Sequence, residues 1–167
     1  GTNLYVSDTY NHLIRQVVIS SRVVTTIAGT GSSGSSNGTG TSARFYYPSG
    51  ITTDGTNLYV VDNSNRLIRK IVISTGVVTT IAGSGTCSST DGTGQESTFC
   101  GTQDITTDGT NLYVADTSNH RIRKIVISTG VVTTLAGWDY GYSDGAGTSG
   151  YGSESSFRNP SGITTDG

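Results

Sequence analysis

Charged side chains are scarce in this sequence. They make up 13% of the 167 residues, and the formal net charge is −2. A protein that holds a nucleic-acid backbone needs a concentrated field of lysine and arginine, so we expect no nucleic-acid partner. No apolar run approaches the roughly 20 residues that a helix needs to cross a bilayer, so we expect no membrane insertion.

Methionine is absent, and no signal-peptide pattern is present. We therefore expect the sequence to begin after processing or to be an excerpt of a longer chain. The hydrophobic share is low, at 32%, whereas glycine is abundant, with 24 residues, and Ser and Thr are frequent. This balance suits an architecture of many short strands and turns.

A stretch of 33 residues occurs twice. Residues 51–83 read ITTDGTNLYVVDNSNRLIRKIVISTGVVTTIAG, and residues 105–137 repeat this with five differences. A third copy is divided between the chain ends, because residues 1–29 hold its later part and residues 163–167 its opening. The copies are spaced by 54, 54 and 58 residues. A period of this size indicates a stack of similar supersecondary units.

Each unit is predicted to form four short strands. In the second copy these are residues 50–54, 57–62, 67–74 and 77–82, which are rich in Ile, Val, Thr and Tyr. Turn residues such as Asp54-Gly55 separate them. Several strands are apolar on both sides, so their sheet must be covered on both faces. Four-stranded sheets that cover one another in this way are the blades of a β-propeller, which makes the predicted fold class all-β.

A short motif marks the same place in each copy: DTYNHLIR at 8–15, DNSNRLIR at 62–69 and DTSNHRIR at 116–123. Together with PSGITTDGTNLYV before it and VVTTIAG after it, this motif resembles the NHL-repeat β-propeller family over essentially the whole chain. The resemblance implies a ring of six blades. Three residues depart from the pattern of the other copies, namely Thr102, Asp104 and Arg22, and we expect them to change turns locally without altering the fold.

The chain is then half of a six-bladed propeller, circularly permuted by one strand. Blade 1 has strands two to four at residues 1–29, blade 2 spans 48–83 and blade 3 spans 103–137. Residues 160–167 form a lone first strand that should complete a blade elsewhere, through Ser161, Gly162, Ile163, Thr164, Thr165 and Asp166. Its recipient is a second copy that closes the ring with two-fold symmetry, the next segment of a longer repeat chain, or the next copy in a filament.

Long connections join the blades at residues 29–47, 84–103 and 138–159 and fall on one face together with the Asn11, Asn65 and Asn119 turns. Long loops are often functional, so we expect a ligand or partner to bind there. Aromatic rings and nearby carboxylates can hold sugars or protein side chains, although Trp138 suits packing on its own blade equally well. The predicted binding residues are Tyr10, Tyr46, Tyr47, Trp138, Tyr140, Tyr142, Asp144 and Tyr151.

Cys87 and Cys100 are the only cysteines and lie in one connection. We predict that they form a disulfide, since no second Cys or His pair accompanies them at zinc spacing. A disulfide implies an oxidising compartment, hence a secreted or cell-surface protein. His12 and His120 are predicted to be surface turn residues, and Asp91-Gly92 and Asp144-Gly145 to be turns, not calcium loops. We expect no metal and no cofactor.

Together these features predict a non-enzymatic extracellular binding or assembly module. Some propeller relatives are lyases or hydrolases, but their sites need unlike residues from unlike blades, whereas the inner strands 51–54 and 105–108 are identical here. The alternatives are a lectin-like carbohydrate binder and a structural subunit of a larger surface assembly or filament. A propeller lyase or hydrolase is the least favoured class.

Overall fold

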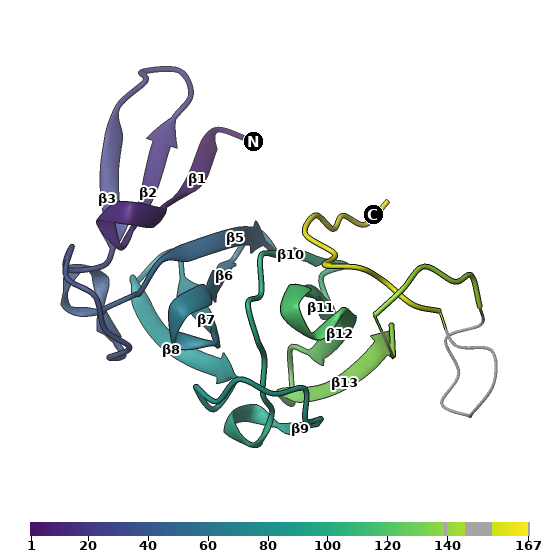
Figure 1. The fold of residues 1–167 in the computed structure, drawn as a ribbon. Helices are drawn as coiled ribbons and strands as arrows, with labels where there is room; N and C mark the ends of the chain where they lie inside the picture. Colours follow the sequence, from purple (N-terminus) through teal and green to yellow (C-terminus); the bar gives the residue numbers. More distant parts are fainter. Residues whose placement is uncertain (139, 146–154, 167) are drawn as a thin grey trace.

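The computed structural model describes residues 1–138, 140–145 and 155–166. Figure 1 shows three antiparallel sheets placed side by side in an arc, one for each blade. The first sheet has three strands, in the order β1 (Asn3–Asp8), β2 (Leu13–Val18) and β3 (Val24–Ala28). The prediction of an all-β propeller fold is thereby confirmed.

The second and third sheets each have five strands. Blade 2 holds β5 (Pro48–Thr53), β6 (Asn57–Asp62), β7 (Leu67–Val72) and β8 (Val77–Ala82), with β4 (Gly38–Thr39) beside β8. Blade 3 holds β10 (Asp104–Thr107), β11 (Asn111–Asp116), β12 (Arg121–Val126) and β13 (Val131–Ala136), with β9 (Gly92–Thr93) beside β13. Short 3-10 helices are η1 (Thr9–Asn11), η2 (Gly40–Ser42), η3 (Asn63–Asn65), η4 (Gly94–Glu96) and η5 (Thr117–Asn119).

The connections before blades 2 and 3 are more regular than the sequence predicts. Each runs to the outer edge of the blade that follows it and adds a two-residue strand there, β4 against β8 and β9 against β13. The outer edge of a sheet carries unpaired backbone groups, and these short strands satisfy some of them. The third strand of blade 2 ends at Val72, earlier than predicted, because the chain turns there and Gly76 N donates to Val72 O at 2.8 Å.

Apolar side chains fill the space between neighbouring blades. One buried cluster joins blades 2 and 3, and another joins blades 1 and 2. The same repeat position takes part in each interface, as Leu58 on blade 2 and Leu112 on blade 3 are both fully buried. Stacking of repeats therefore supplies the core, as expected for a protein whose units cannot each bury both faces alone.

The inner strands β5 and β10 approach one another closely. Gly50 N donates to Gln103 O at 2.9 Å, and a Cβ added at Gly50 would lie 2.6 Å from the Cα of Asp104. A side chain is therefore excluded at Gly50 by backbone on the neighbouring blade. The sequence departure at Asp104 is local, because β10 begins at this residue and pairs regularly with β11.

The two ends of the arc are open. On blade 1, Leu4, Val6 and Val24 are 53%, 43% and 50% exposed. Their equivalents in blades 2 and 3 are at most 1% exposed, namely Leu58, Val60, Val78, Leu112, Val114 and Val132. Blade 1 thus presents to solvent the face that the other two blades bury against the blade before them.

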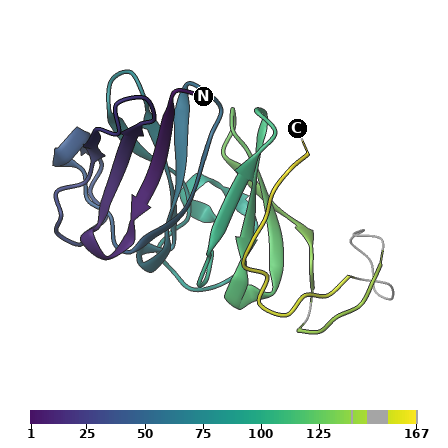
Figure 2. The same cartoon turned by 90° about the horizontal axis from the view of Figure 1, so that it is seen from above.

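At the other end, residues 160–166 run alongside blade 3 without forming a strand (Figure 2). Ile163 N donates to Asp104 Oδ2 at 3.1 Å, and Thr165 Oγ1 donates to Thr107 O at 3.2 Å. The predicted lone strand thus lies next to β10 in the position of a further inner strand. Its strand partner would belong to a further blade, which is not among the described residues.

Candidate functional site

Each blade carries one group of polar residues that we call the polar clamp. In blade 2 it consists of Asp62 at the end of β6, Asn65 in η3 and Arg69 in β7, and Asp62 and Arg69 are both fully buried. Arg69 Nη1 donates to Asp62 Oδ2 at 2.7 Å, and Asn65 Nδ2 donates to the same oxygen at 2.9 Å. Antiparallel pairing places Asp62 and Arg69 close together on neighbouring strands.

The clamp holds the connection that precedes its blade. Arg69 donates to the backbone oxygens of Arg44 and Ser36 at 3.1 and 3.2 Å, and to Asn37 Oδ1 at 2.9 Å. Its guanidinium also lies over the Phe45 ring, 5.2 Å from the centroid. One buried arginine thus fixes a long glycine- and serine-rich connection through charge-assisted hydrogen bonds and a cation–π contact.

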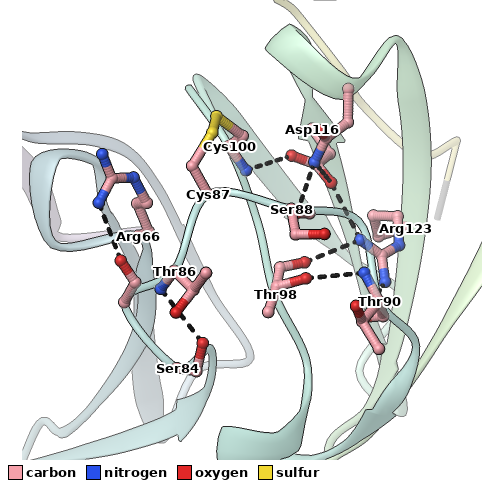
Figure 3. The surroundings of a disulfide bond; sticks show 12 residues. Arg66, Ser84, Thr86, Cys87, Ser88, Thr90, Thr98, Cys100, Asp116 and Arg123 are labelled. Atoms are coloured by element: carbon pink, nitrogen blue, oxygen red, sulfur yellow. Dashed lines mark hydrogen bonds and ion pairs between the residues drawn. A yellow bond between two sulfur atoms is a disulfide. The ribbon is translucent and has the colours of Figure 1, made fainter.

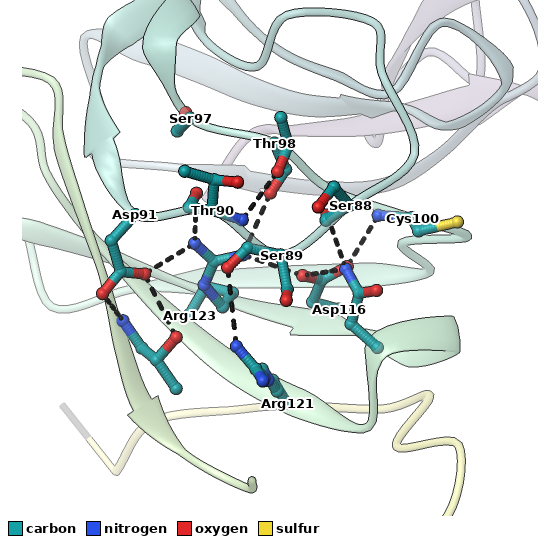
Figure 4. A network of polar contacts seen from close by, with 12 residues as sticks. Ser88, Ser89, Thr90, Asp91, Ser97, Thr98, Cys100, Asp116, Arg121 and Arg123 are labelled. Atoms are coloured by element: carbon teal, nitrogen blue, oxygen red, sulfur yellow. Dashed lines mark hydrogen bonds and ion pairs between the residues drawn. The ribbon is translucent and has the colours of Figure 1, made fainter. Parts of the chain in front are cut away.

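Blade 3 repeats this arrangement (Figure 4). Arg123 donates to Asp116 Oδ2 at 3.0 Å, to the backbone oxygens of Thr98 and Thr90 at 3.0 and 2.9 Å, and to Asp91 Oδ1 at 2.8 Å. It lies over Phe99, with 5.3 Å to the ring centroid. The turn reading of Asp91 was therefore incomplete, because its carboxylate pairs with the buried arginine.

Blade 1 has the same clamp residues, and among the described residues no connection enters its clamp. Asn11 Nδ2 donates to Asp8 Oδ1 at 2.8 Å, and Arg15 Nη1 lies 3.3 Å from Asp8 Oδ2. The side chains of Arg15 and Asp8 are 29% and 28% exposed, whereas those of the corresponding pairs in blades 2 and 3 are fully buried. Asp8, Arg15 and Val24 line an open hollow of about 530 Å³.

Burial has a direct effect on the clamp carboxylates. Desolvation raises the pKa of Asp62, and hydrogen bonds from Tyr46 N, Asn65 and Arg69 act in the opposite direction. The pKa of Asp116 is raised for the same reason, while Asn119, the Cys100 backbone and Arg123 oppose the rise. An aspartate in such a site depends on every one of its donors.

The sequence motif indicates the family resemblance, but the clamp that its residues form is evident only in the structure. A signal was present, because a sequence with so few charges repeats an Asp and an Arg seven residues apart in all three copies. Strands joined by a tight turn place such positions diagonally across from each other on one face of the sheet, within reach of a long side chain, which suggests an ion pair.

The Cys87–Cys100 disulfide is present, as predicted (Figure 3). It closes the second connection over a separation of 13 residues. Next to the bridge, Cys100 N donates to Asp116 Oδ1 at 2.9 Å. The covalent bond therefore fixes the backbone that contributes a donor to the blade 3 clamp.

Three predicted binding residues meet where blade 1 adjoins the first connection. Tyr46 and Tyr47 stack with ring centroids 5.0 Å apart, and Tyr10 lies edge-on to Tyr47 at 5.6 Å. His12 contacts both rings, and its Nδ1 accepts a hydrogen bond from Tyr47 N at 3.2 Å. His12 is thus a turn residue with a structural bond. We call these four side chains the tyrosine cluster.

The tyrosine cluster borders a small open hollow of about 310 Å³. Tyr10 is 84% exposed and Tyr46 is 39% exposed, so aromatic surface is available there. Polar side chains complete the rim of the hollow, which is lined by Thr9, Tyr10, Tyr47, Ser49, Asn63 and Gln103.

Trp138, Tyr140 and Tyr142 belong to the last connection, which follows blade 3 at the far end of the arc from blade 1 (Figure 1). Trp138 is 50% exposed and packs under Arg121, with 5.0 Å from the guanidinium to the ring. Tyr140 contacts His120 and Arg158. Tyr142 is 96% exposed, and Asp144 is exposed as well. Tyr151 lies outside the described residues.

Aspartates in the Asp-Gly hairpins bond to the tyrosine of the following strand. Tyr59 Oη donates to Asp54 Oδ2 at 2.8 Å, and Tyr113 donates to Asp108 at 2.7 Å. Partial burial alone would raise the pKa of Asp54, but hydrogen bonds from Asn57, Thr56 and Tyr59 lower it to about 2. The turn explanation for these repeated aspartates is correct, and the tyrosine bond adds a tie between strands.

No group of three or more His, Cys, Asp and Glu side chains that could hold a metal ion occurs among the described residues. Across residues 1–138, 140–145 and 155–166, no helix is both long and apolar enough to span a membrane.

Comparison with known proteins identifies relatives of this chain. No protein-family model matches the chain. NHL repeat-containing protein 2 from Homo sapiens is 33% identical over 144 residues, and the same holds for the Bos taurus protein. The match covers 79% of this chain and 20% of either relative. The chain therefore spans about a fifth of the length of these curated relatives.

Solved structures share the architecture. A protein of unknown function from Bacteroides thetaiotaomicron superposes over 99% of this chain and 40% of its own, with a TM-score of 0.77 and 26% identity. An auxiliary nutrient binding protein from the same organism gives 0.72 at 20% identity, over 98% of this chain and 40% of its own. A catalytically inactive virginiamycin B lyase from Staphylococcus aureus gives 0.53 at 17%, over 79% of this chain and 36% of its own. The last two show the propeller fold alone.

Proposed function

Because the chain belongs to the NHL-repeat β-propeller family, we propose that it is a non-enzymatic binding and assembly module, half of a six-bladed ring that a second copy closes. In this ring, residues 161–166 of each copy become the inner strand of blade 1 in the other. The exchange is reciprocal and closes with two-fold symmetry, so the open face of blade 1 and the open face of blade 3 would both be covered in each chain.

The observation that supports this proposal is a hydrogen bond of the repeat whose two partners, for blade 1, lie near opposite ends of the sequence. In blade 2, Asp54 at the end of the inner strand accepts a hydrogen bond from Tyr59 of the next strand. In blade 1 the corresponding tyrosine is Tyr5, and the corresponding aspartate is Asp166 at the other end of the chain. A second copy brings the two together.

The two open faces suit the same assembly. Blade 1 exposes Leu4, Val6 and Val24, which its sister blades bury against the blade before them. Blade 3 exposes Leu135, by 44%, on its opposite face, and this residue lines an open hollow together with Ile122 and residues 163–166. Joining these faces repeats an interface that the chain already makes twice, and it removes apolar surface from water.

We expect the intact chain to sediment as a dimer at micromolar concentration and the chain without residues 162–167 to sediment as a monomer. Gly162→Ala offers a gentler variant, because a Cβ there meets nothing within 4 Å in one chain, whereas at the equivalent Gly50 it meets the next blade at 2.6 Å. This variant should keep the circular dichroism spectrum and dimerise more weakly. A well-folded truncated dimer, or a monomeric intact chain, would refute the strand exchange.

The tyrosine cluster favours carbohydrate as a second candidate ligand class. Exposed aromatic faces beside Ser49, Asn63 and Gln103 combine a stacking surface with polar groups, as small-molecule sites usually do. The tyrosine cluster adjoins the open face of blade 1, since Tyr10 also lines the hollow in front of Arg15, so a carbohydrate bound there would lie beside the seam of the ring.

A glycan array tests the carbohydrate proposal. Tyr10→Ala is expected to lower the signal at least about tenfold, the order of effect for losing one stacking ring at a binding hot spot. Tyr142→Ala removes another exposed ring, at the far end of the arc, and should leave the signal unchanged. Binding that survives Tyr10→Ala, or is lost only in Tyr142→Ala, would place the ligand elsewhere.

The disulfide supports an extracellular or cell-surface location, since such bonds persist in oxidising compartments. The near-identity of blades 2 and 3 supports a binding role over catalysis, because an active site needs different residues for different chemical tasks. A structural subunit of a larger surface assembly or filament is the alternative if the exchanged strand passes head to tail.

A further inference from the structure

The clamp of blade 1 is an incomplete site. In blades 2 and 3 the clamp arginine is fully buried and binds four groups of the preceding connection: two backbone oxygens, an Asn or Asp side chain and a phenylalanine ring. Arg15 has the aspartate of its own blade, and none of these four groups contacts it within the described residues. The hollow in front of Arg15 is where the connection lies in the other blades.

The last connection carries the missing groups. Asp144-Gly145 corresponds to Asn37-Gly38 and to Asp91-Gly92, and Phe157 corresponds to Phe45 and Phe99, although Asp144 and Phe157 are 13 positions apart where the other two pairs are 8 apart. Among the described residues, the clamp of a following blade is not present to receive them. Asp144 is exposed, and Tyr142, Asp144 and Phe157 border an open hollow of their own.

The backbone around Phe157 already has the shape seen in a filled clamp. In the first connection, Phe45 forms a parallel bridge with Ser33, and Phe45 O accepts from Gly34 N at 3.2 Å. In the last connection, Phe157 forms a parallel bridge with Tyr140, and Phe157 O accepts from Gly141 N at 3.1 Å. The backbone around Phe157 therefore matches the backbone around Phe45, although among the described residues no clamp arginine lies over the Phe157 ring.

We propose that the clamp of blade 1 is a receptor for Asp144 and Phe157 of a second copy, such that Arg15 pairs with Asp144 and lies over Phe157. The inference rests on the proposed ring and deepens it, because it names the residues that each copy contributes to the seam. Charge complementarity supports it. The Arg15 side chain borders an open hollow, and the second copy would supply the Asp144 carboxylate to that hollow. Continuity supports it too, because the seam copies the two clamps that exist within the chain.

In the proposed dimer, the Arg15 side chain, which is 29% exposed in the single chain, would be buried together with Asp144. Removing one partner of a buried, hydrogen-bonded charge pair weakens an interface by a large factor, much of it from the charge left without a partner. Asn37 fills the position of Asp144 in blade 2 without a charge, so the site should also accept an amide.

Sedimentation of the full chain over a dilution series tests the proposal. Asp144→Arg is expected to raise the dimer dissociation constant at least about thirty-fold, because it places a cation against Arg15. Asp144→Asn should stay within about threefold of the parent, as the amide of Asn37 suggests. Phe157→Ala and Arg15→Met should weaken the dimer like Asp144→Arg.

The outcomes separate the two proposals. A dimer that dissociates in the Asp144→Arg variant and persists in the Asp144→Asn variant supports the filled clamp. A parent dimer that Asp144→Arg leaves unchanged overturns the clamp while the ring stands. A parent chain that is monomeric overturns the ring and the clamp together. Circular dichroism of each variant shows whether a lost dimer reflects an unfolded chain.

Discussion

Replacing Asp62 with alanine is expected to lower the free energy of unfolding by about 3–5 kcal/mol, because it leaves a buried guanidinium without its counter-charge. Arg69 is fully buried, and Asp62 is its one carboxylate partner among the described residues. For a domain of this size the loss corresponds to a fall in melting temperature of roughly 6–20 °C. Thermal and urea denaturation at one fixed protein concentration measure it.

The chain offers a matched control in Asp8, the same residue of the same motif. Its pair with Arg15 is partly exposed at 3.3 Å in the single chain, so Asp8→Ala should cost no more than about 1 kcal/mol there. Both variants are therefore compared in the chain without residues 162–167, which we expect to be monomeric. Equal losses for Asp8→Ala and Asp62→Ala would contradict the view that burial gives the clamp its strength. An Asp62→Leu/Arg69→Met variant should recover part of the loss, since it removes the unpaired charge.

Reduction of the Cys87–Cys100 disulfide is expected to lower stability by about 3 kcal/mol in the chain-entropy description of a loop of this length. The closed loop spans a separation of 13 residues and includes backbone that the blade 3 clamp binds. Melting with and without reductant measures the effect, and the Cys87→Ser/Cys100→Ser variant should be insensitive to reductant. Two free thiols in freshly isolated protein, found by alkylation and intact mass, would contradict the prediction.

The sequence predicts the fold well because the repeat is nearly identical. Strand boundaries such as Asn57–Asp62 and Val77–Ala82 agree with the prediction, since alternating apolar residues and Asp-Gly or Thr-Gly turns mark them. The long connections were harder, because glycine and serine carry little pattern. Their short strands β4 and β9 depend on a free sheet edge that exists only after the blade has formed.

The candidate sites were predictable to different degrees. The disulfide follows from cysteine counting, and the exposure of Tyr10 and Tyr142 fits their place in long connections. The sequence predicts that Tyr10, Tyr46 and Tyr47 share a face with the last connection. The structure adds that the two sets lie on different blades, at opposite ends of the arc. The sequence alone does not show how far apart equivalent positions of different blades lie in space.

The polar clamp also affects the order in which parts of the chain can become structured during synthesis. Arg69 binds backbone oxygens that precede it by 25 and 33 residues, and Arg123 does the same in the next blade. During synthesis at about 5–20 residues per second, each connection therefore waits a few seconds for the arginine that fixes it. The second connection can close earlier, because its two cysteines are only 13 residues apart and both precede Arg123. Oxidation would then organise this connection ahead of its blade, while the first connection depends on the arrival of β7.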